Sequence, residues 1–130
     1  MSVHPAEYQM TVQKWTTAGL MLACFAGSEQ AAAENSRNFT GIAAFYSTNY
    51  TGRTARGDHY DPKKFTAAHK TLPFGTRLRV TDTRSQRSVV VVVNDRGPFT
   101  KGRALDLSLA AAKALNMLDR GLIKVTAVIE

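Results

Sequence analysis

Five consecutive valines constrain the fold of this chain more than any other feature. The run Ser88–Val93 is apolar at odd and even positions alike, so an extended segment here needs cover on both of its faces. Such a strand lies in the interior of a sheet or in the wall of a barrel. The flanking segments 83–87 and 94–103 are rich in charged residues and chain breakers, and they are typical of a turn and a loop.

Three further segments have the patterns of strands, and one has that of a helix. Residues 41–46 are an apolar run with aromatic content, and residues 76–82 alternate strictly between apolar and polar side chains. Residues 122–129 alternate again, with inward positions Ile123, Val125, Ala127 and Ile129. Ser108 is suited to cap a helix whose apolar residues recur every three positions at Leu109, Ala112, Leu115 and Leu118, and which ends over 116–121. Short strands with one helix in about 90 residues predict a small closed barrel, which leaves no exposed sheet edge.

Composition limits the chain to one domain and points to an anionic partner. The sequence has 130 residues and a single Cys, which excludes a disulfide framework and a Cys-based zinc site within one chain. Residues 35–130 carry 16 Lys and Arg against 7 Asp and Glu. A compact domain with this excess attracts nucleic acid, anionic lipid or the acidic polymers of a bacterial cell wall, and composition does not choose among them.

The N-terminal segment has the features of an export signal. An uncharged, largely apolar run from Trp15 to Ala26 follows Lys14 and precedes the small residues of 31–33. We predict that residues 1–33 are a signal peptide or a disordered N-terminal segment, that residues 34–39 are a linker and that the domain spans 40–130. The alternative is a short buried helix of the domain. The run is shorter than the roughly 20 residues of a spanning helix.

Cys24 allows two interpretations within this segment. The sequence around it loosely resembles a lipoprotein attachment box, in which the Cys is acylated and anchors the protein to the outer membrane. We favour the other interpretation, an apolar residue of the signal core. Either way, we expect an exported protein of the periplasm or cell envelope.

Several polar residues are candidates for chemistry. Asp95 follows the valine run after Asn94, where a carboxylate is placed for general acid–base catalysis, although it could instead cap its own turn and pair with Arg96. His69 follows two alanines and is a second candidate, with a packed structural His as the alternative. Asp58, His59 and Asp61 could hold a metal, but the lack of thiolates and of helical His spacing favours a turn rich in Asp. We expect no metal and no cofactor.

Four segments together resemble the rare lipoprotein A family. They are Gly-Ile-Ala-Ala-Phe-Tyr at 41–46, Thr-Ala-Ala-His-Lys-Thr-Leu-Pro-Phe-Gly-Thr at 66–76, Val-Asn-Asp-Arg-Gly-Pro-Phe at 93–99 and Leu-Asp-Leu-Ser at 105–108. The resemblance covers residues 40–130. It implies a mainly β fold, a six-stranded double-psi β-barrel with one short helix, preceded here by the signal segment.

The resemblance also implies an activity. Enzymes of this family are endolytic lytic transglycosylases, which cleave the β-1,4 bond between N-acetylmuramic acid (MurNAc) and N-acetylglucosamine (GlcNAc) in peptidoglycan and leave 1,6-anhydro-MurNAc ends. The family prefers glycan strands without stem peptides. Its catalytic aspartate falls on Asp95, which would act first as acid and then as base, and its active-site histidine falls on His69. A family glutamate falls on Asp58. His69 and Asp58 would orient the sugar or tune Asp95.

Substrate-binding residues follow from the same assignment. Arg96, Lys101 and Arg103 would meet lactyl carboxylates, Tyr46 would offer a ring face to a sugar, and Asp106 would contact the substrate. The expected partner is the peptidoglycan glycan strand, bound by a monomer. Nucleic acid is not expected, because export separates it from the protein. The rival hypothesis is a non-catalytic module of the expansin or barwin type, which binds wall polysaccharide without cutting it.

Overall fold

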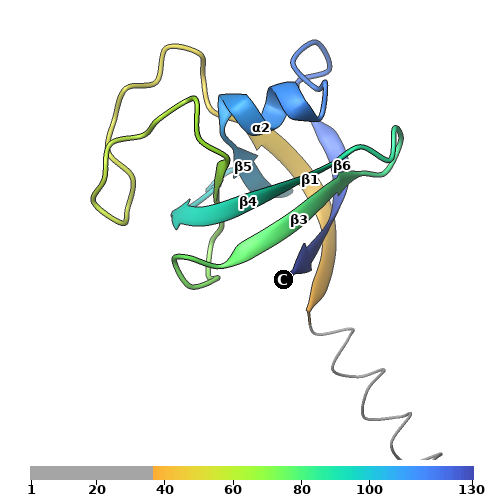
Figure 1. Ribbon diagram of the computed structural model, residues 1–130, viewed down its shortest axis with the longest axis horizontal. Helices are drawn as coiled ribbons and strands as arrows, with labels where there is room; N and C mark the ends of the chain where they lie inside the picture. Colours follow the sequence, from red (N-terminus) through yellow and green to blue (C-terminus); the bar gives the residue numbers. More distant parts are fainter. Residues whose placement is uncertain (1–36) are drawn as a thin grey trace, which may run out of the picture. The chain divides into compact units, whose positions relative to one another are not determined.

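The computed structural model describes residues 37–130, which fold into a closed six-stranded barrel with one short helix (Figure 1). The predicted signal segment and Cys24 lie outside the described residues. In chain order the elements are β1 (Asn38–Phe45), β2 (Thr66–Ala68), β3 (Arg77–Asp82), β4 (Ser88–Asp95), β5 (Arg103–Leu107), α2 (Leu109–Ala114) and β6 (Ile123–Ile129). No helix of this part of the chain has the length and apolar character needed to cross a membrane.

The barrel closes in the strand order β1-β5-β2-β4-β3-β6, which confirms the predicted six-stranded barrel. Two of the pairings, β1 with β5 and β2 with β4, are parallel, and the other four are antiparallel. Parallel neighbours need long connections. The connection between β1 and β2, which are not neighbours in the barrel, contains residues 47–64 and leaves the barrel as the yellow loop in Figure 1.

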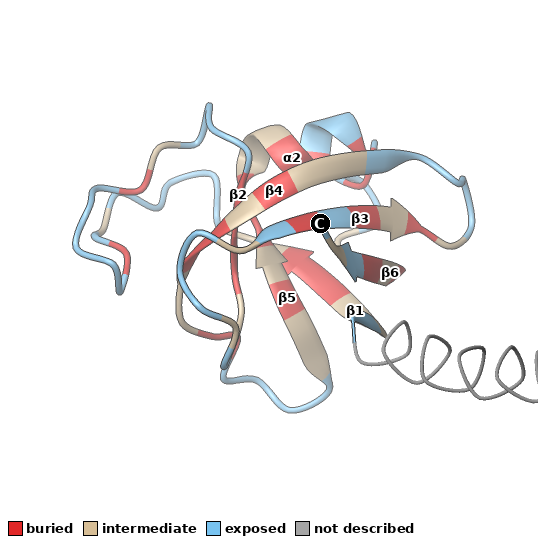
Figure 2. Ribbon diagram, turned by 60° about the horizontal axis from the view of Figure 1, so that its bottom comes forward, coloured by how far each residue is buried: buried red, intermediate tan, exposed pale blue. Residues whose placement is uncertain are grey.

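Alternation along the strands builds the core. Val91 and Val93 of β4 are fully buried in the barrel, together with Leu105 and Leu107 of β5. The two valines at the intervening positions, Val90 and Val92, are only half-buried, so the outer face of β4 is covered less completely than the valine run predicts. Figure 2 shows the buried positions concentrated in the strands and in α2, with most loop residues exposed.

The predicted start of the first strand is wrong, and two strands were not predicted. The first strand begins at Asn38, inside the predicted linker, because Phe39 packs against the barrel core and so belongs to the domain. The strands that were not predicted are β2 and β5. β2 is only 3 residues long, and β5 follows directly on the charged loop, so neither has a clear strand pattern.

The helix is also shorter than predicted. It ends at Ala114, with Leu115 as its C-cap, and Asn116 adopts a left-handed φ of 54°. Ser108 caps its N-terminus as predicted, because its hydroxyl accepts from the Ala111 N–H. Leu118, which the three-residue period placed on the buried face, lies beyond the helix and is 39% exposed.

Candidate active site

Strand register places Asp95 and Asp106 on one face of the barrel wall. Asp106 of β5 lies opposite Ala44 of β1 on one side and opposite Ala68 of β2 on the other, and Ala68 lies opposite Asp95 of β4. Residues opposite each other across neighbouring strands share a face, so the two carboxylates point the same way with a methyl group between them. A bulge between Ala67 and Ala68 brings Asp95 into this row. The two Cα atoms are two strand spacings apart, about 10 Å.

Asp95 is held by three hydrogen bonds. Its Oδ2 accepts from the Tyr46 hydroxyl at 2.6 Å, and its Oδ1 accepts from the Ala55 and Arg96 N–H groups at 2.7 and 2.8 Å. The turn that brings the Arg96 N–H into place continues through Gly97, whose φ of 123° is rarely accessible to other residues. Both oxygens therefore act as acceptors, which is the pattern of an ionised carboxylate.

Asp106 has the opposite surroundings. It is half-buried, and its Oδ1 lies out of contact with solvent and without a hydrogen-bond partner among residues 37–130. Burial raises the pKa of Asp106, the nearby Arg103 cation lowers it in part, and the charge of Asp95 raises it further. A carboxyl group that is short of donors and lies beside a negative charge favours its protonated form.

Three tyrosines cover one side of this carboxylate pair. The Tyr46 ring stacks on Tyr50 with centroids 5.3 Å apart, and it meets the Tyr60 ring edge-on at 4.5 Å. Burial, together with the hydrogen bond and the charge of Asp95, raises the pKa of Tyr46 well above its ordinary value, so the hydroxyl stays a donor. The stacked ring of Tyr50 faces Tyr46, where a sugar was expected to stack. Tyr50 itself is 38% exposed, and it is the member of this cluster that solvent reaches most.

Asp58 organises a turn that contacts Asp95. Its Oδ1 accepts from the Thr54 hydroxyl at 2.6 Å, and its Oδ2 accepts from the Arg56 guanidinium at 2.9 Å. These two hydrogen bonds, that of Arg56 above all, hold the pKa of Asp58 far below its ordinary value. The same turn presents the Ala55 N–H to Asp95, so Asp58 acts on Asp95 through the backbone and not by contact.

The other members of the Asp58, His59 and Asp61 cluster have separate roles. His59 pairs with Arg53 in an isolated bridge across the loop, and Asp61 accepts from the Lys63 N–H at 2.9 Å, as an Asp-based turn does. Residues 37–130 hold no group of three His, Cys, Asp or Glu side chains gathered closely enough for a metal ion.

His69 borders the carboxylates without bonding to either side chain. Its Nδ1 accepts from the Thr71 and Leu72 N–H groups, at 3.1 and 3.0 Å, which leaves the proton of a neutral ring on Nε2. Burial and, less strongly, the nearby cations Arg96 and Lys70 lower the pKa of His69. Its backbone N–H donates to the Asp95 carbonyl at 3.2 Å. The centroid of the Phe39 ring lies 5.3 Å from the centroid of the His69 ring.

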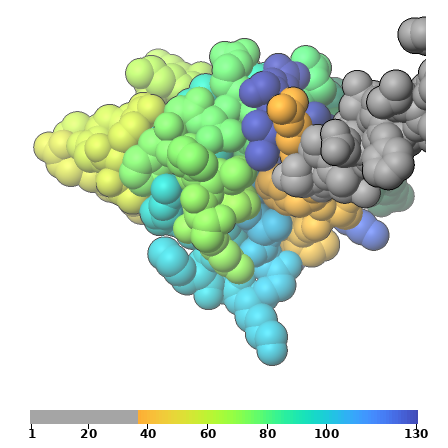
Figure 3. Space-filling view, turned by 90° about the horizontal axis from the view of Figure 1, so that it is seen from below, coloured from red at the N-terminus to blue at the C-terminus, as the bar shows by residue number. Residues whose placement is uncertain are grey.

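The three predicted cations divide into two kinds. Arg96 fixes the loop after β2, because its Nη1 donates to the His69 and Leu72 carbonyls at 3.2 and 2.8 Å and its guanidinium lies 4.0 Å over the Phe74 ring. Lys101 is exposed and Arg103 is half-buried, and neither side chain makes a hydrogen bond or ion pair within the described part of the chain. Figure 3 shows the segment after β4, in cyan, projecting at the bottom of the view, apart from the yellow loop 47–64 at the left.

Comparison with known proteins decides the family. A sequence model for the family described as "Lytic transglycolase" matches residues 38–127, which is nearly the whole described domain. The chain belongs to this family. Two similar relatives are the probable endolytic peptidoglycan transglycosylase RlpA of Nostoc sp., 55% identical over 91 residues, and the endolytic peptidoglycan transglycosylase RlpA of Pasteurella multocida, 51% identical over 82 residues. These alignments cover 68% and 62% of the chain. The chain spans about a quarter of the length of these relatives, 24% and 28%.

Solved structures share the barrel at lower identity. The Streptomyces papain inhibitor superposes with a TM-score of 0.59 at 26% identity, covering 72% of this chain and 94% of the inhibitor. The apo expansin of Clavibacter michiganensis superposes with a TM-score of 0.57 at 24% identity, covering 72% of this chain and 50% of the expansin. A variant of that expansin has been solved with cellohexaose. The double-psi barrel predicted from the four segments is thereby confirmed.

Sequence reasoning missed the residues that support Asp95 from the loop 47–64. Thr54, Ala55 and Tyr60 have no motif that marks them, because each acts through a turn or a packed ring. The position of Asp106 did carry a signal. It is a lone carboxylate between the apolar residues Leu105 and Leu107 of a strand, which places it on the opposite face from the core.

Proposed function

We propose that this domain is a peptidoglycan lytic transglycosylase. It cleaves the β-1,4 bond between MurNAc and GlcNAc and leaves a 1,6-anhydro-MurNAc end. The single observation that carries the proposal is the pair of unlike carboxylates across Ala68, one saturated with donors and the other short of them. Membership of the lytic transglycolase family and the names of the relatives support the same reaction.

The chemistry needs one proton donor that later becomes a base. A carboxylic acid donates its proton to the leaving O4 of GlcNAc while the C1–O4 bond breaks, and the 6-hydroxyl of MurNAc closes onto C1. The O6 proton then passes to the carboxylate that the first step created. No water is consumed, and the proton count of the protein is restored.

The contacts favour Asp106 as this donor and Asp95 as its charged neighbour. From the family resemblance, the acid–base role is expected at Asp95 and substrate contact at Asp106. In the structure both Asp95 oxygens are already acceptors, whereas the Oδ1 of Asp106 has no hydrogen-bond partner among residues 37–130 and burial raises the pKa of that carboxyl group. Asp95 then serves catalysis by its charge, which opposes ionisation of Asp106.

The surrounding residues position the glycan. Arg103 lies near Asp106 with an unengaged guanidinium and is placed to take a lactyl carboxylate next to the scissile bond. Lys101 extends the same positive charge outward. Arg96 and His69 act as positioning residues, because Arg96 ties the His69 loop down and the His69 N–H donates to the Asp95 carbonyl. Free lactyl carboxylates occur on strands without stem peptides, so we expect those strands to be preferred.

We also propose that the protein works outside the cytoplasm as a monomer, where the sacculus is its partner. The apolar run before the domain supports export, by a signal peptide or with Cys24 acylated. Fractionation of cells, with mass determination of the mature N-terminus, tests this proposal. A cytoplasmic protein that keeps residues 1–33 would contradict it.

Product analysis tests the activity against its rival. Purified protein is incubated with glycan strands freed of stem peptides, and the products are analysed by mass spectrometry. Anhydro ends, 18 Da lighter than hydrolysed ends by the loss of one water, support the proposal. Binding to sacculi without any new chain ends would instead favour a non-catalytic module, to which the barrel shared with an expansin gives some support.

A further inference from the structure

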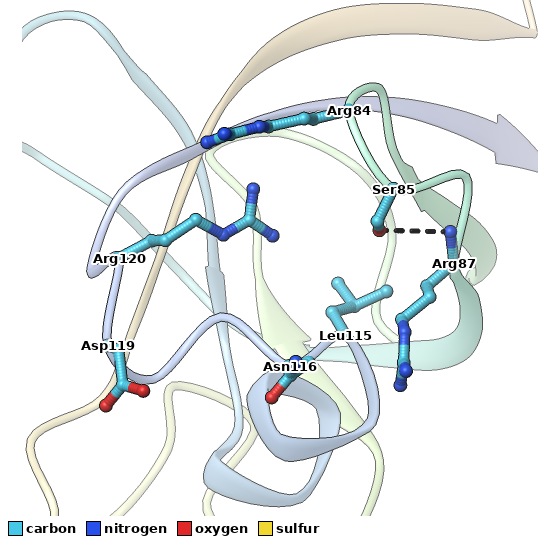
Figure 4. Close-up of a pocket in the computed structure, with 7 residues that line it drawn as sticks. All are labelled: Arg84, Ser85, Arg87, Leu115, Asn116, Asp119 and Arg120. Carbon is cyan, nitrogen blue, oxygen red and sulfur yellow. Dashed lines mark hydrogen bonds between the residues drawn. The ribbon is translucent and has the colours of Figure 1, made fainter.

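A hollow remote from the carboxylate pair lies between the β3–β4 turn and the segment after α2. It has a volume of about 500 Å³ and is lined by Arg84, Ser85, Arg87, Leu115, Asn116, Asp119 and Arg120 (Figure 4). Asp95 is the last residue of β4, and Arg87 directly precedes its first residue. Eight residues of strand separate them, a distance of about 25 Å.

The back of this hollow is a closed ionic network. Asp82 is 1% exposed, and its carboxylate accepts from the Arg120 guanidinium, from the Ser85 hydroxyl at 2.9 Å and from the Arg84 N–H at 3.1 Å. These hydrogen bonds, that of Arg120 first, lower the pKa of Asp82 to about 2. The charge of Arg120 is therefore balanced from within the protein, and its position is fixed.

The rim carries charge that the protein does not balance. The side chains of Arg84 and Arg87 make no hydrogen bond or ion pair with any residue of 37–130, and both residues are exposed. Asp119 also lines the hollow without such a partner. The free charge at the rim is thus a net of one positive, which matches one monoanion better than a phosphate dianion.

We propose that this hollow binds the lactyl carboxylate of MurNAc on a stretch of glycan other than the one being cut. Figure 4 shows the guanidinium groups of Arg84 and Arg87 on opposite sides of the hollow, with the Leu115 side chain pointing into it between them. The two exposed arginine side chains would turn inward to hold the carboxylate, and Leu115 would lie near the lactyl methyl. The identity of this ligand rests on the proposed function, since strands without stem peptides carry a free carboxylate on every MurNAc. The site would keep the domain on the wall between cuts.

The probe is MurNAc, and GlcNAc is its matched control because it lacks only the lactyl group. The full chain, isotopically labelled and carrying Asp106→Asn so that no turnover occurs, is titrated with each sugar by NMR. We expect MurNAc to shift the backbone amides of 84–87 and 115–120, and GlcNAc to leave them in place. Equal shifts with both sugars, or none with MurNAc, would overturn the proposal.

Variants locate the binding and separate it from charge alone. Arg84→Gln with Arg87→Gln should weaken binding about tenfold, since two charge-assisted contacts are lost. Arg120 is left in place, because its removal would expose Asp82. The matched control is Arg77→Gln with Lys124→Gln, which removes two exposed cations outside the hollow and should leave binding unchanged. Equal weakening by both pairs of substitutions would show a diffuse charge effect and contradict a built site.

Two further measurements separate this inference from the proposed function and from other anions. Inorganic phosphate is titrated in the same way, and binding as tight as that of MurNAc would show a general oxyanion site and overturn the lactyl assignment. On short soluble glycans the Arg84→Gln, Arg87→Gln variant should form anhydro ends at the wild-type rate. If the unsubstituted hollow does not bind MurNAc although the wild-type protein forms anhydro ends, this inference alone is defeated. Specific MurNAc binding by a wild-type protein that forms no anhydro ends defeats the proposed function alone.

Discussion

Two aspartates in the barrel wall, Asp82 at the end of β3 and Asp106 in β5, show how the same side chain becomes structural or reactive. Asp82 is almost fully buried and is saturated by a guanidinium, a hydroxyl and a backbone N–H. Asp106 is only half-buried, yet one of its oxygens has no partner within residues 37–130. Their pKa values move in opposite directions, downward for Asp82 and upward for Asp106.

The difference teaches that the supply of donors, and not depth of burial, decides the role of a carboxylate. Donors that match both oxygens stabilise the charge and make it part of the fold. A carboxyl group with too few donors beside a second negative charge keeps its proton, and that proton can be transferred to a substrate.

The largest effect is expected from Asp106→Asn. This change removes the proton donor while keeping the shape of the side chain, so formation of anhydro ends should fall by about 10²–10⁴-fold. The thermal midpoint should stay the same or rise, because the unpaired carboxylate is gone. The rate is measured by mass spectrometry of the products. Wild-type turnover by a folded Asp106→Asn protein would show that Asp106 is not the acid.

Arg120→Ala should produce the largest loss of stability. It leaves the Asp82 carboxylate buried without its main partner, which should lower the free energy of unfolding by about 2–4 kcal/mol. The control is Arg79→Ala, which breaks the exposed pair with Glu130 and should cost less than about 1 kcal/mol. Denaturant unfolding measures both. Equal losses would contradict a special role for the buried pair.

The stability that the Asp82–Arg120 pair contributes should depend on pH. The pKa of Asp82 is lower in the folded protein than in the unfolded chain, so the stability it contributes is present at neutral pH. This contribution should be lost as the pH falls from about 4 through the folded value of about 2, and the difference between wild type and Arg120→Ala should shrink in that window. A difference that persists below this window would show that the pair acts by packing and not by charge.

Asp95→Asn distinguishes the two carboxylates by the pH profile of the rate. The charge of Asp95 helps to raise the pKa of Asp106, so its removal should lower that pKa. Asp106 would then lose its proton at a lower pH, and the alkaline limb of the rate profile should move to lower pH. A variant with no activity at any pH would instead favour Asp95 itself as the acid.

The smallest effect is expected at Asp58, where the family has a glutamate. Both Asp58→Ala and Asp58→Glu should slow the enzyme, by about tenfold or less, because each disturbs the turn that presents the Ala55 N–H to Asp95. Asp61→Ala is the matched control, since within residues 37–130 the Asp61 side chain accepts only from the Lys63 N–H. Equal rates for wild type, Asp58→Ala and Asp58→Glu would show that the turn holds without this residue.

Local patterns were sufficient to predict β3, β4 and β6, the capped helix and the closure of the barrel. The strands and the helix depend on patterns among neighbours in the sequence, namely alternation in strands and a capping hydroxyl before a helix. Closure of the barrel was predicted because it leaves no exposed sheet edge. The four short segments that resemble the rare lipoprotein A family predicted the double-psi topology and placed Asp95, His69 and Asp106 among the site residues. No local pattern predicted β2, whose 3 residues are held in place only by pairing with β4 and β5.

The tertiary structure alone decided what each polar residue does. Only strand register brings Asp106 within reach of the charge of Asp95, and only the folded loop supplies Asp95 with the Ala55 N–H. The protonation of a carboxyl group depends on donors and charges within a few ångströms, and two of the three donors to Asp95 come from residues 40 or more positions away in the chain. The sequence by itself determined which residues could carry charge or protons, and the packing of distant segments determined which of them remain unsatisfied and reactive.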